Sequence, residues 1–346
     1  MRIVVNDIAA SKGGALSVLK DFYNAVREYD KENEWIFLLG ENYLEETENI
    51  KIITLPHVKK SRFNKLLFDF FKGKNFINSL KPDIVFSLQN IITFGLKTPQ
   101  IVYIHQSIPF QDKKSFSFFK RSERSLAIIQ HFIGSIIKKS ARKAQKIIVQ
   151  TEWMKEAVAN KAKTEKNKIS VVMPNINVDL VDNQENYSFK RFFYPTSNAI
   201  YKNNDCIYKA CELLQGSGVK DFQVEITVSS SPNELVKAIG YIDRKEVWKK
   251  YLSSVLVYPS YIESFSFPLA EARRFNSVIL ASDCNFSREV LRGYDNVHFF
   301  NPFKPEELAE LMKKSISGEI IKQGKIMQSD NSDSWLEVIN IIREKS

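Results

Sequence analysis

Cysteine and histidine are scarce in this chain of 346 residues, which contains three cysteines and four histidines. The cysteines (Cys206, Cys211 and Cys284) form no CxxC pair and are too few for a disulfide framework, which is typical of a protein from a reducing cytoplasm. The histidines lie far apart and lack the HExxH spacing of a zinc site. We therefore expect neither a bound metal ion nor a cofactor.

Long apolar runs are also missing. No window approaches the roughly 18 consecutive apolar residues that suggest a membrane-spanning helix. The first ten residues, MRIVVNDIAA, lack the basic region and long apolar stretch of a signal peptide, and they predict a β-strand instead. With 44% hydrophobic and 26% charged residues, the composition is that of a soluble globular protein, and we expect a cytoplasmic one.

Acidic residues are rare between residues 51 and 146, where 4 Asp and Glu accompany 19 Lys and Arg. Residues 1–175 contain 29 basic and 17 acidic residues, a net charge of +12, whereas the rest of the chain has 21 and 23, a net charge of −2. We therefore expect the N-terminal half to meet an anionic partner. A nucleic acid is not expected, because no RNP-type or helix-turn-helix motif is present.

Short apolar segments alternate with amphipathic helical patterns along the first half of the chain. The expected strands are 3–5, 35–40, 51–55, 83–88, 100–105, 146–151 and 168–175. Helices are expected after Gly13-Gly14, over 63–80 and over 124–142. Such alternation predicts a parallel sheet covered by helices on both faces.

The pattern restarts after an aperiodic stretch at 176–190, which we interpret as a linker. The expected strands are then 192–197, 224–229, 239–242, 255–260 and 277–283, and the expected helices are 203–214, 244–252 and 268–275. We therefore predict two α/β domains, residues 1–175 and 191–330, with ligands bound at the carboxyl ends of the strands. The amphipathic segment 331–346 is expected to form a helix that packs back on the N-terminal domain.

Two glutamates flank a predicted helix start in the segment VYPSYIESFSFPLAEARRFNSVILASD (257–283). Proline suits a first helical turn because its missing N–H needs no partner there, and the free N–H groups and dipole of that turn attract a diphosphate. We expect the turn to bind substrate through Ser266, Phe267, Pro268 and Leu269. Glu263 and Glu271 would accept hydrogen bonds from sugar hydroxyls; the alternative is a dipole partner and a solvated residue.

A lysine precedes the second predicted helix of the C-terminal domain. Lys202 lies in the loop after the strand FFYPTS (192–197), where it can reach a substrate phosphate as a point charge. Because charge develops on a leaving phosphate, a preplaced cation lowers the barrier, and we expect Lys202 to be catalytic. The alternative is a solvated loop lysine.

Two features of the N-terminal half fit the same chemistry. Gly13-Gly14 permits a tight strand-to-helix turn and close approach of a ligand to the backbone. His105 ends the predicted strand QIVYIH, at the edge of the sheet where ligands bind. At that edge His105 faces the place where ligands bind; a structural histidine is the alternative.

The order of residues in the C-terminal segment resembles the nucleotide-sugar site of the family 4 retaining glycosyltransferases of bacterial surface-polysaccharide synthesis. That pattern is Pro259-Ser260, then Glu263, a serine-containing turn, Pro268 and Glu271-Ala272. The resemblance implies the GT-B fold, in which two Rossmann-like doubly wound α/β domains face a central cleft. It also implies that Glu271 holds the nucleotide ribose and Glu263 the hydroxyls of the donor sugar. By the same resemblance Gly13 and Gly14 would bind substrate beside the donor phosphates, and His105 would be a binding or catalytic group near the donor sugar and the acceptor.

The same resemblance implies a function. A hexose-type sugar would pass from a nucleotide diphosphate sugar to a lipid-linked oligosaccharide acceptor of a capsule or O-antigen pathway, with retention of configuration and without a metal ion. One position departs from the family pattern, since Ser197 stands where an arginine usually precedes the lysine by five residues. The departure leaves two alternatives open: a non-catalytic GT-B scaffold or partner subunit, and a nucleotide-sugar epimerase.

Basic and aromatic residues are interleaved in two stretches of the N-terminal half. Residues 59–74 contain six Lys and Arg, with phenylalanines and leucines at helical spacing, and residues 113–124 repeat this chemistry. Such a pattern suits an interfacial helix on anionic lipid, so we expect a peripheral protein at the inner face of the cell membrane. The alternative is an amphipathic core helix whose solvated side is basic.

Overall fold

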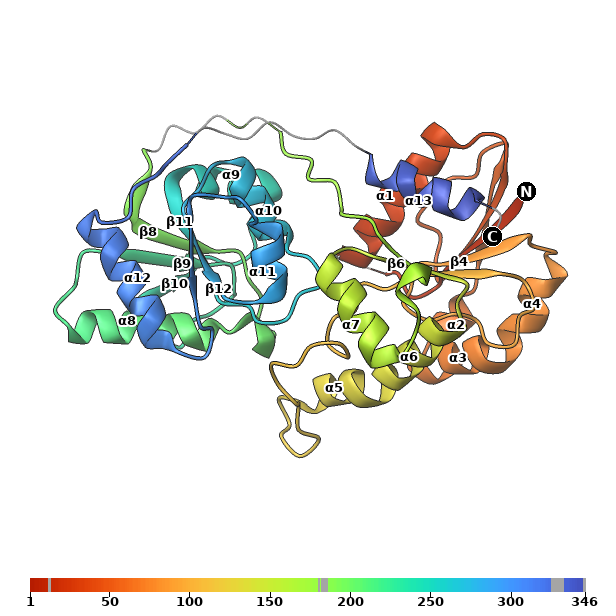
Figure 1. Cartoon of the computed structure of the whole chain (residues 1–346), viewed down its shortest axis with the longest axis horizontal. Coiled ribbons are helices and arrows are strands. Elements are labelled where there is room, and N and C mark those ends of the chain that lie inside the picture. The colour runs from red at the N-terminus through yellow and green to blue at the C-terminus, as the bar shows by residue number, and fades with distance from the viewer. Residues whose placement is uncertain (12–13, 180, 182–185, 325–332, 345–346) are drawn as a thin grey trace. The chain divides into compact units, whose positions relative to one another are not determined.

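The structure is a computed structural model that describes residues 1–11, 14–179, 181, 186–324 and 333–344. The chain forms two compact units (Figure 1). The first contains Met1–Phe119, Arg124–Asn175 and the C-terminal helix, and the second contains Lys120–Glu123 and the described residues after Asn175. Both units are α/β structures, and each is described by itself.

The first unit is built on a seven-stranded parallel sheet with the strand order β3-β2-β1-β4-β5-β6-β7. The strands are β1 (Arg2–Asp7), β2 (Glu34–Leu39), β3 (Ile50–Thr54), β4 (Ile84–Ser87), β5 (Gln100–Tyr103), β6 (Lys146–Val149) and β7 (Ile169–Val171). The central strands are buried almost throughout, because helices cover both faces of the sheet.

The helices of this unit confirm the expected alternation with strands. They are α1 (Gly14–Tyr29), α2 (Pro56–Lys59), α3 (Arg62–Leu67), α4 (Gly73–Ser79), α5 (Arg124–Ala127), α6 (Gly134–Lys143) and α7 (Glu152–Ala162), with a 3₁₀ turn η3 (Lys166–Lys168). The helices predicted over 63–80 and 124–142 each contain a π-helical segment, η1 (Phe68–Lys72) and η2 (Ile128–Ile133).

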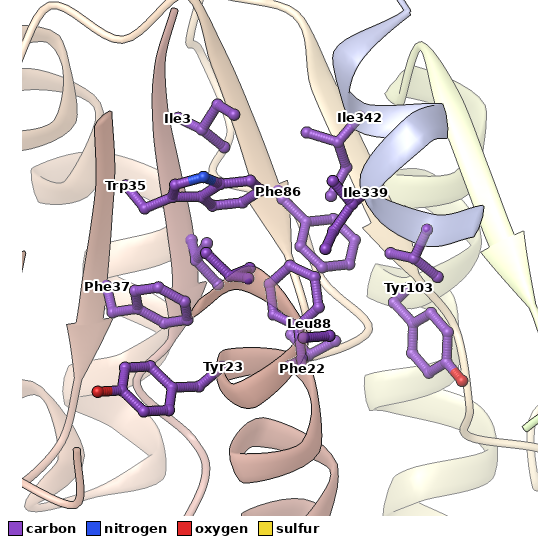
Figure 2. Close-up of a cluster of buried hydrophobic side chains, with 14 of the residues drawn as sticks. Ile3, Phe22, Tyr23, Trp35, Phe37, Phe86, Leu88, Tyr103, Ile339 and Ile342 are labelled. Carbon is purple, nitrogen blue, oxygen red and sulfur yellow. The ribbon is translucent and has the colours of Figure 1, made fainter. Parts of the chain in front are cut away.

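The last described helix, α13 (Ser334–Arg343), packs in the core of the first unit. It lies beside α1 (Figure 1), and Figure 2 shows Ile339 and Ile342 directed toward Phe86 of β4. The ring of Trp335 lies 5.4 Å from that of Phe22, between ring centroids. Residues at the end of the chain therefore complete a hydrophobic core that begins with the first strand.

The second unit contains a six-stranded parallel sheet with the strand order β10-β9-β8-β11-β12-β13. The strands are β8 (Ser188–Tyr194), β9 (Gln223–Ile226), β10 (Val236–Ala238), β11 (Ser254–Tyr258), β12 (Ile279–Ser282) and β13 (Val297–Phe300). The helices are α8 (Asn204–Gly216), α9 (Arg244–Ser253), α10 (Phe267–Arg274), α11 (Asn285–Val290) and α12 (Pro305–Ser317), with a 3₁₀ turn η4 (Ile200–Lys202).

Several details of the second unit differ from the prediction, and helices α11 and α12 were not predicted. The strand expected at 239–242 is wrong, because Gly240 has a φ of 71°, a left-handed conformation that does not continue a strand, and β10 lies just before it. Strand β8 begins at Ser188, inside the expected linker 176–190, of which residues 180 and 182–185 lie outside the described residues. Strand β13 was not predicted, since its four residues are mostly half-buried and show no clear alternation.

Across the described residues, no helix is both long and apolar enough to cross a membrane.

Candidate functional site

A glutamate in the loop after β11 is the centre of a polar cluster in the second unit. One oxygen of Glu263, Oε1, accepts hydrogen bonds from Lys202 Nζ at 2.6 Å, from Ser260 Oγ at 2.8 Å and from the Tyr258 hydroxyl at 3.0 Å. The side chains of Lys202 and Glu263 are 19% and 17% exposed. The structure therefore brings two of the predicted site residues into direct contact.

The loop that carries Lys202 is held by two side chains. The Tyr194 hydroxyl, at the end of β8, donates to the carbonyl oxygen of Lys202 at 3.0 Å. The next residue, Asn203, has a φ of 61° and donates from Nδ2 to the carbonyl oxygen of Pro302 at 2.7 Å. Asparagine tolerates this left-handed conformation, which turns the chain into α8 directly after the lysine.

The ammonium group of Lys202 keeps its charge although it is buried. Burial acts to lower its pKa, but the nearby charge of Glu263, with smaller contributions from Tyr194 and Tyr201, raises the pKa above its ordinary value. Lys202 is therefore a cation at neutral pH whose charge is balanced by Glu263. An anionic ligand that binds here must share Lys202 with that carboxylate.

The helix start predicted at Pro268 is present as α10. Ser266 is its N-cap and accepts a hydrogen bond from the backbone N–H of Leu269 at 3.4 Å, while Pro268 occupies the first turn. The N–H of Leu269, expected to face a ligand, thus has a long and weak bond to Ser266. Phe267 is partly exposed beside this turn.

Glu271 lies one turn into α10 and forms an ion pair that the sequence interpretation missed. Its Oε1 accepts from Arg244 Nε at 3.0 Å and from Arg244 Nη2 at 2.8 Å. Burial raises the pKa of Glu271, and the Arg244 charge opposes this rise. Arg244 is the first residue of α9, after the N-cap Asp243, and only the Asp-Arg-Lys-Glu sequence at this helix start marked its position.

His105 lies just beyond the carboxyl end of β5 in the first unit and is oriented by Asn90. Asn90 Oδ1 accepts from the backbone N–H groups of His105 (2.8 Å) and Gln106 (2.9 Å), so its Nδ2 is the donor that faces His105 Nε2 at 3.1 Å. Burial lowers the pKa of His105 to about 4. The ring is therefore neutral, and its proton lies on Nδ1, which has no partner among the described residues.

Of the predicted glycine pair, Gly13 lies outside the described residues, and Gly14 is the first residue of α1. A Cβ atom at Gly14 would meet no atom within 4 Å, so packing in the described structure does not demand glycine here. The role of this pair as a ligand-binding turn stays a prediction. Within the described residues, no group of three or more His, Cys, Asp or Glu side chains could hold a metal ion.

Models of known protein families match regions in both units. The family described as Glycosyltransferase Family 4 matches residues 13–180, and the family described as Glycosyl transferases group 1 matches residues 216–330. Glycosyltransferase family models thus match the chain over most of its length, one in each half. Glu263 and Glu271 lie within the second matched region and His105 within the first, whereas Lys202 lies in neither.

Solved structures agree on the fold. WaaG, described as a glycosyltransferase involved in lipopolysaccharide biosynthesis, superimposes with a TM-score of 0.70 at 14% identity, over 99% of this chain and 100% of WaaG. The outer core galactosyltransferase WaaB gives 0.66 at 16% identity over 98% of each chain. Anabaena HepE, solved with UDP-glucose, gives 0.59 at 12% identity over 92% of this chain and 90% of HepE.

These structures confirm the GT-B fold class. No curated protein sequence matches the chain significantly.

Proposed function

We propose that this protein transfers a hexose-type sugar from a nucleotide diphosphate sugar to a lipid-linked saccharide of a bacterial surface polysaccharide. The transfer would retain the anomeric configuration and use no metal ion. The observation that supports this most is the contact between Lys202 and Glu263, three residues before the N-cap of α10. A cation, a carboxylate and a helix start then lie within one short stretch of structure, which suits a diphosphate joined to a sugar.

Each group of this cluster has a distinct part in the proposed reaction. When the bond between the anomeric carbon and the phosphate oxygen breaks, the electron pair goes to the phosphate, and Lys202 stabilises the developing charge. The acceptor hydroxyl attacks the face that the nucleotide leaves, and its proton passes to the departing phosphate. Glu263 orients Lys202 and binds sugar hydroxyls, and Glu271, with Arg244 beside it, binds the ribose.

The two carboxylates act here as binding groups. A glycosidase would need an acid and a base or nucleophile on either side of one glycosidic bond. Glu263 and Glu271 are instead each engaged by a cation, Lys202 and Arg244 respectively. Both carboxylates therefore already serve as hydrogen-bond acceptors, as a binding role requires.

In the first unit, His105 and the Gly13-Gly14 turn would contact the donor sugar and the acceptor. The neutral ring of His105 would donate the Nδ1 hydrogen to a sugar oxygen once ligand binding uncovers this buried atom, because Asn90 already occupies Nε2. Because this hydrogen-bond donor is neutral, it can approach a substrate without competing for the negative charge of the diphosphate.

The choice of donor and acceptor rests on similarity. HepE was solved with UDP-glucose, and WaaG is involved in lipopolysaccharide biosynthesis, so UDP-hexoses and lipid-linked saccharides are the first substrates to test. A lipid-linked acceptor would bring the protein to the inner face of the cell membrane as a peripheral protein. The basic first half of the chain supports such a location.

Calorimetry with UDP-glucose and GDP-mannose tests the donor site. The wild type should bind one of these, and Glu271→Gln should weaken that binding by about tenfold or more, because the ribose loses a charged acceptor. Glu246→Gln is the control, since Glu246 is an exposed residue of α9 that pairs with Lys249. If neither nucleotide sugar nor any other of a donor panel binds, the proposal is wrong.

A second assay separates transfer from the two alternatives. Incubation of the protein with radiolabelled donor and bacterial membranes should move label into the lipid fraction, and nucleotide should be released in equal amount. Label that stays in a nucleotide sugar of altered stereochemistry would indicate an epimerase. Binding of the nucleotide sugar without transfer or nucleotide release would indicate a non-catalytic scaffold. This alternative is considered because Ser197 stands where the family pattern has an arginine.

A further inference from the structure

An apolar groove opens on the surface of the first unit, away from the residues discussed above. Its volume is about 510 Å³, which lies within the range of about 300–1,000 Å³ typical of ligand pockets. One wall comes from α3 and η1, and the other from η2 and α6. The lining residues are Phe63, Leu66, Leu67, Phe70, Phe71, Phe132, Ser135, Ile136 and Lys139.

Three phenylalanines of the groove are largely exposed. The exposed fractions are 68% for Phe63, 66% for Phe71 and 59% for Phe132. Phe118 and Phe119, in the adjoining loop, are also exposed, so this region supplies five of the eleven large exposed apolar residues among those described. Clusters of this kind mark sites where another molecule binds.

The two walls share an unusual backbone. Both contain a π-helical segment, and each segment is followed directly by a glycine, Gly73 or Gly134. A Cβ at Gly73 would lie 2.7 Å from the carbonyl oxygen of Phe68, and one at Gly134 would lie 2.7 Å from Cβ of Pro109. Gly73 is therefore needed for the wide turn that carries Phe70 and Phe71, and Gly134 for close packing against Pro109. π-Helical turns are frequent at functional sites.

The charge around the groove has one sign. The stretches 59–74 and 113–143 contain two acidic residues, Asp69 and Glu123, and both are buried. Asp69 is also paired with Lys65, at 2.6 Å. The exposed charged residues of these stretches that belong to the first unit are Lys60, Lys72, Lys74, Lys113, Arg124, Lys139, Arg142 and Lys143.

Lys139 joins the apolar and the charged parts. It lines the groove, and its ammonium nitrogen lies 5.3 Å from the ring centroid of Phe94 and 5.8 Å from that of Phe70. Its charged end thus lies against two aromatic rings, so a positive charge stands within the apolar lining of the groove. The occupant that this surface fits is apolar inside the groove and negatively charged around it.

We propose that the groove receives an acyl chain of an anionic phospholipid from the bilayer surface. Phe63, Phe71 and Phe132 enter the headgroup and acyl boundary, and the surrounding lysines and arginines contact the headgroups. A second copy of the chain fits less well, because a symmetric contact would bring two positive surfaces together. The choice of a lipid rests in part on the proposed function, which places the acceptor in a membrane.

Vesicle binding tests this proposal. The wild type should sediment with vesicles of phosphatidylcholine and phosphatidylglycerol but not with phosphatidylcholine alone. Phe71→Ser and Phe132→Ser should each weaken binding by about tenfold, because burial of one phenylalanine is lost. Leu213→Ser is the control, since Leu213 is an exposed apolar residue of α8 in the second unit.

A fluorescence measurement tests whether lipid acyl chains lie next to the groove. The added emission of Phe71→Trp, relative to the wild type with its four tryptophans, should be quenched by vesicles whose lipids are brominated in the acyl chain, and that of Leu213→Trp should not. Vesicle binding without this quenching would overturn the proposal. So would wild-type protein that ignores anionic vesicles but forms a dimer that Phe71→Ser dissociates.

The outcome of the vesicle experiments is independent of the test for nucleotide-sugar binding. Phe71→Ser should bind the nucleotide sugar as the wild type does, because Phe71 lies in the first unit and the Lys202 cluster lies in the second. A protein that binds vesicles through the groove but no donor would sink only the proposed function. A protein that binds donor but no vesicles would sink only the groove proposal.

Discussion

At the scale of single residues, the Lys202–Glu263 ion pair contributes to stability, and in the proposed reaction Lys202 also contributes to catalysis. Both side chains are mostly buried, and Ser260 and Tyr258 add hydrogen bonds to the same carboxylate oxygen. Removing one member of such a pair leaves the other charge buried without its partner, whereas replacing both removes the problem. Activity should not follow this pattern, because only Lys202 supplies a positive charge to the leaving phosphate.

We therefore predict that stability and activity separate in this pair. Lys202→Met should lower the free energy of unfolding by about 1–3 kcal/mol and should lower kcat by about 100- to 1,000-fold. The double variant Lys202→Met/Glu263→Gln should regain most of the stability but none of the activity. Thermal unfolding and nucleotide release measure the two effects; a double variant that regains kcat would contradict the assigned role of Lys202.

The shifted pKa values of His105 and Asp7 predict opposite effects of pH on the stability of the first unit. The pKa of His105 is lowered from 6.5 to about 4 by burial, so folding favours its neutral form, and its contribution to stability is lost as the pH falls through that interval. Burial raises the pKa of Asp7, at the end of β1, from 3.8 to about 7 despite the Lys65 charge. Asp7 therefore destabilises the fold increasingly as the pH rises from about 4 to 7.

Asp7→Asn should remove one of these two opposing pH dependences of the free energy of unfolding. The variant should gain stability with pH between about 4 and 6.5 more steeply than the wild type, since the His105 effect is then no longer offset. Calorimetric scans across this pH interval measure the change. Asp83→Asn, at an exposed carboxylate near β1, is the control. Parallel pH profiles of Asp7→Asn and wild type would show that Asp7 ionises normally.

Among the elements, α10 has the closest link between local sequence and the site. This helix has eight residues, and its N-cap Ser266 is also a predicted substrate-binding residue. Ser266→Ala should lower the free energy of unfolding by about 1 kcal/mol, while Ser266→Asp, which keeps a capping oxygen, should not. Ser266→Asp should nevertheless weaken binding of a nucleotide sugar, because it adds a negative charge beside the diphosphate. Calorimetry of both variants checks this, and equal donor affinity of Ser266→Asp and wild type would place the diphosphate elsewhere.

Most elements could be predicted because their burial determines their sequence. Strands such as β1 and β11 are covered on both faces and therefore appear as short apolar runs between helical patterns. The π-helical segments were not predictable, because one extra residue per turn barely changes an amphipathic pattern. Strand β13 was missed since its side chains are only partly buried.

The candidate site was predictable in part for a similar reason. Glu263, Pro268 and Glu271 stand at fixed spacing within one continuous segment, so their pattern is visible in the sequence. Their partners are far away along the chain: Arg244 pairs with Glu271 across 27 positions, and Lys202 with Glu263 across 61. Asn90 orients His105 only because β4 and β5 are neighbours in the sheet. Such pairings depend on the tertiary fold and leave no local signal.

For the molecule as a whole, α13 connects the end of the chain to the core of the first unit. The chain leaves this unit after Asn175, builds the second unit, and returns with a helix whose Val338, Ile339 and Ile342 are buried beside strand β1 and helix α1. The first unit therefore cannot complete its core until the second has been synthesised. Its stability should depend on α13 far more than that of the second unit does.

Ile339→Ala tests this dependence. Ile339 is fully buried, and replacing it with alanine should lower the stability of the first unit by about 2–5 kcal/mol, because a cavity forms beside Phe86. Hydrogen exchange should then show faster exchange in β1, β4 and α1, with unchanged protection in β11 and β12 of the second unit. Ile321→Ala, at an exposed isoleucine, is the control. A uniform loss of protection in both units would mean that they unfold as one. Faster exchange confined to α13 would mean that this helix docks too weakly to support the core.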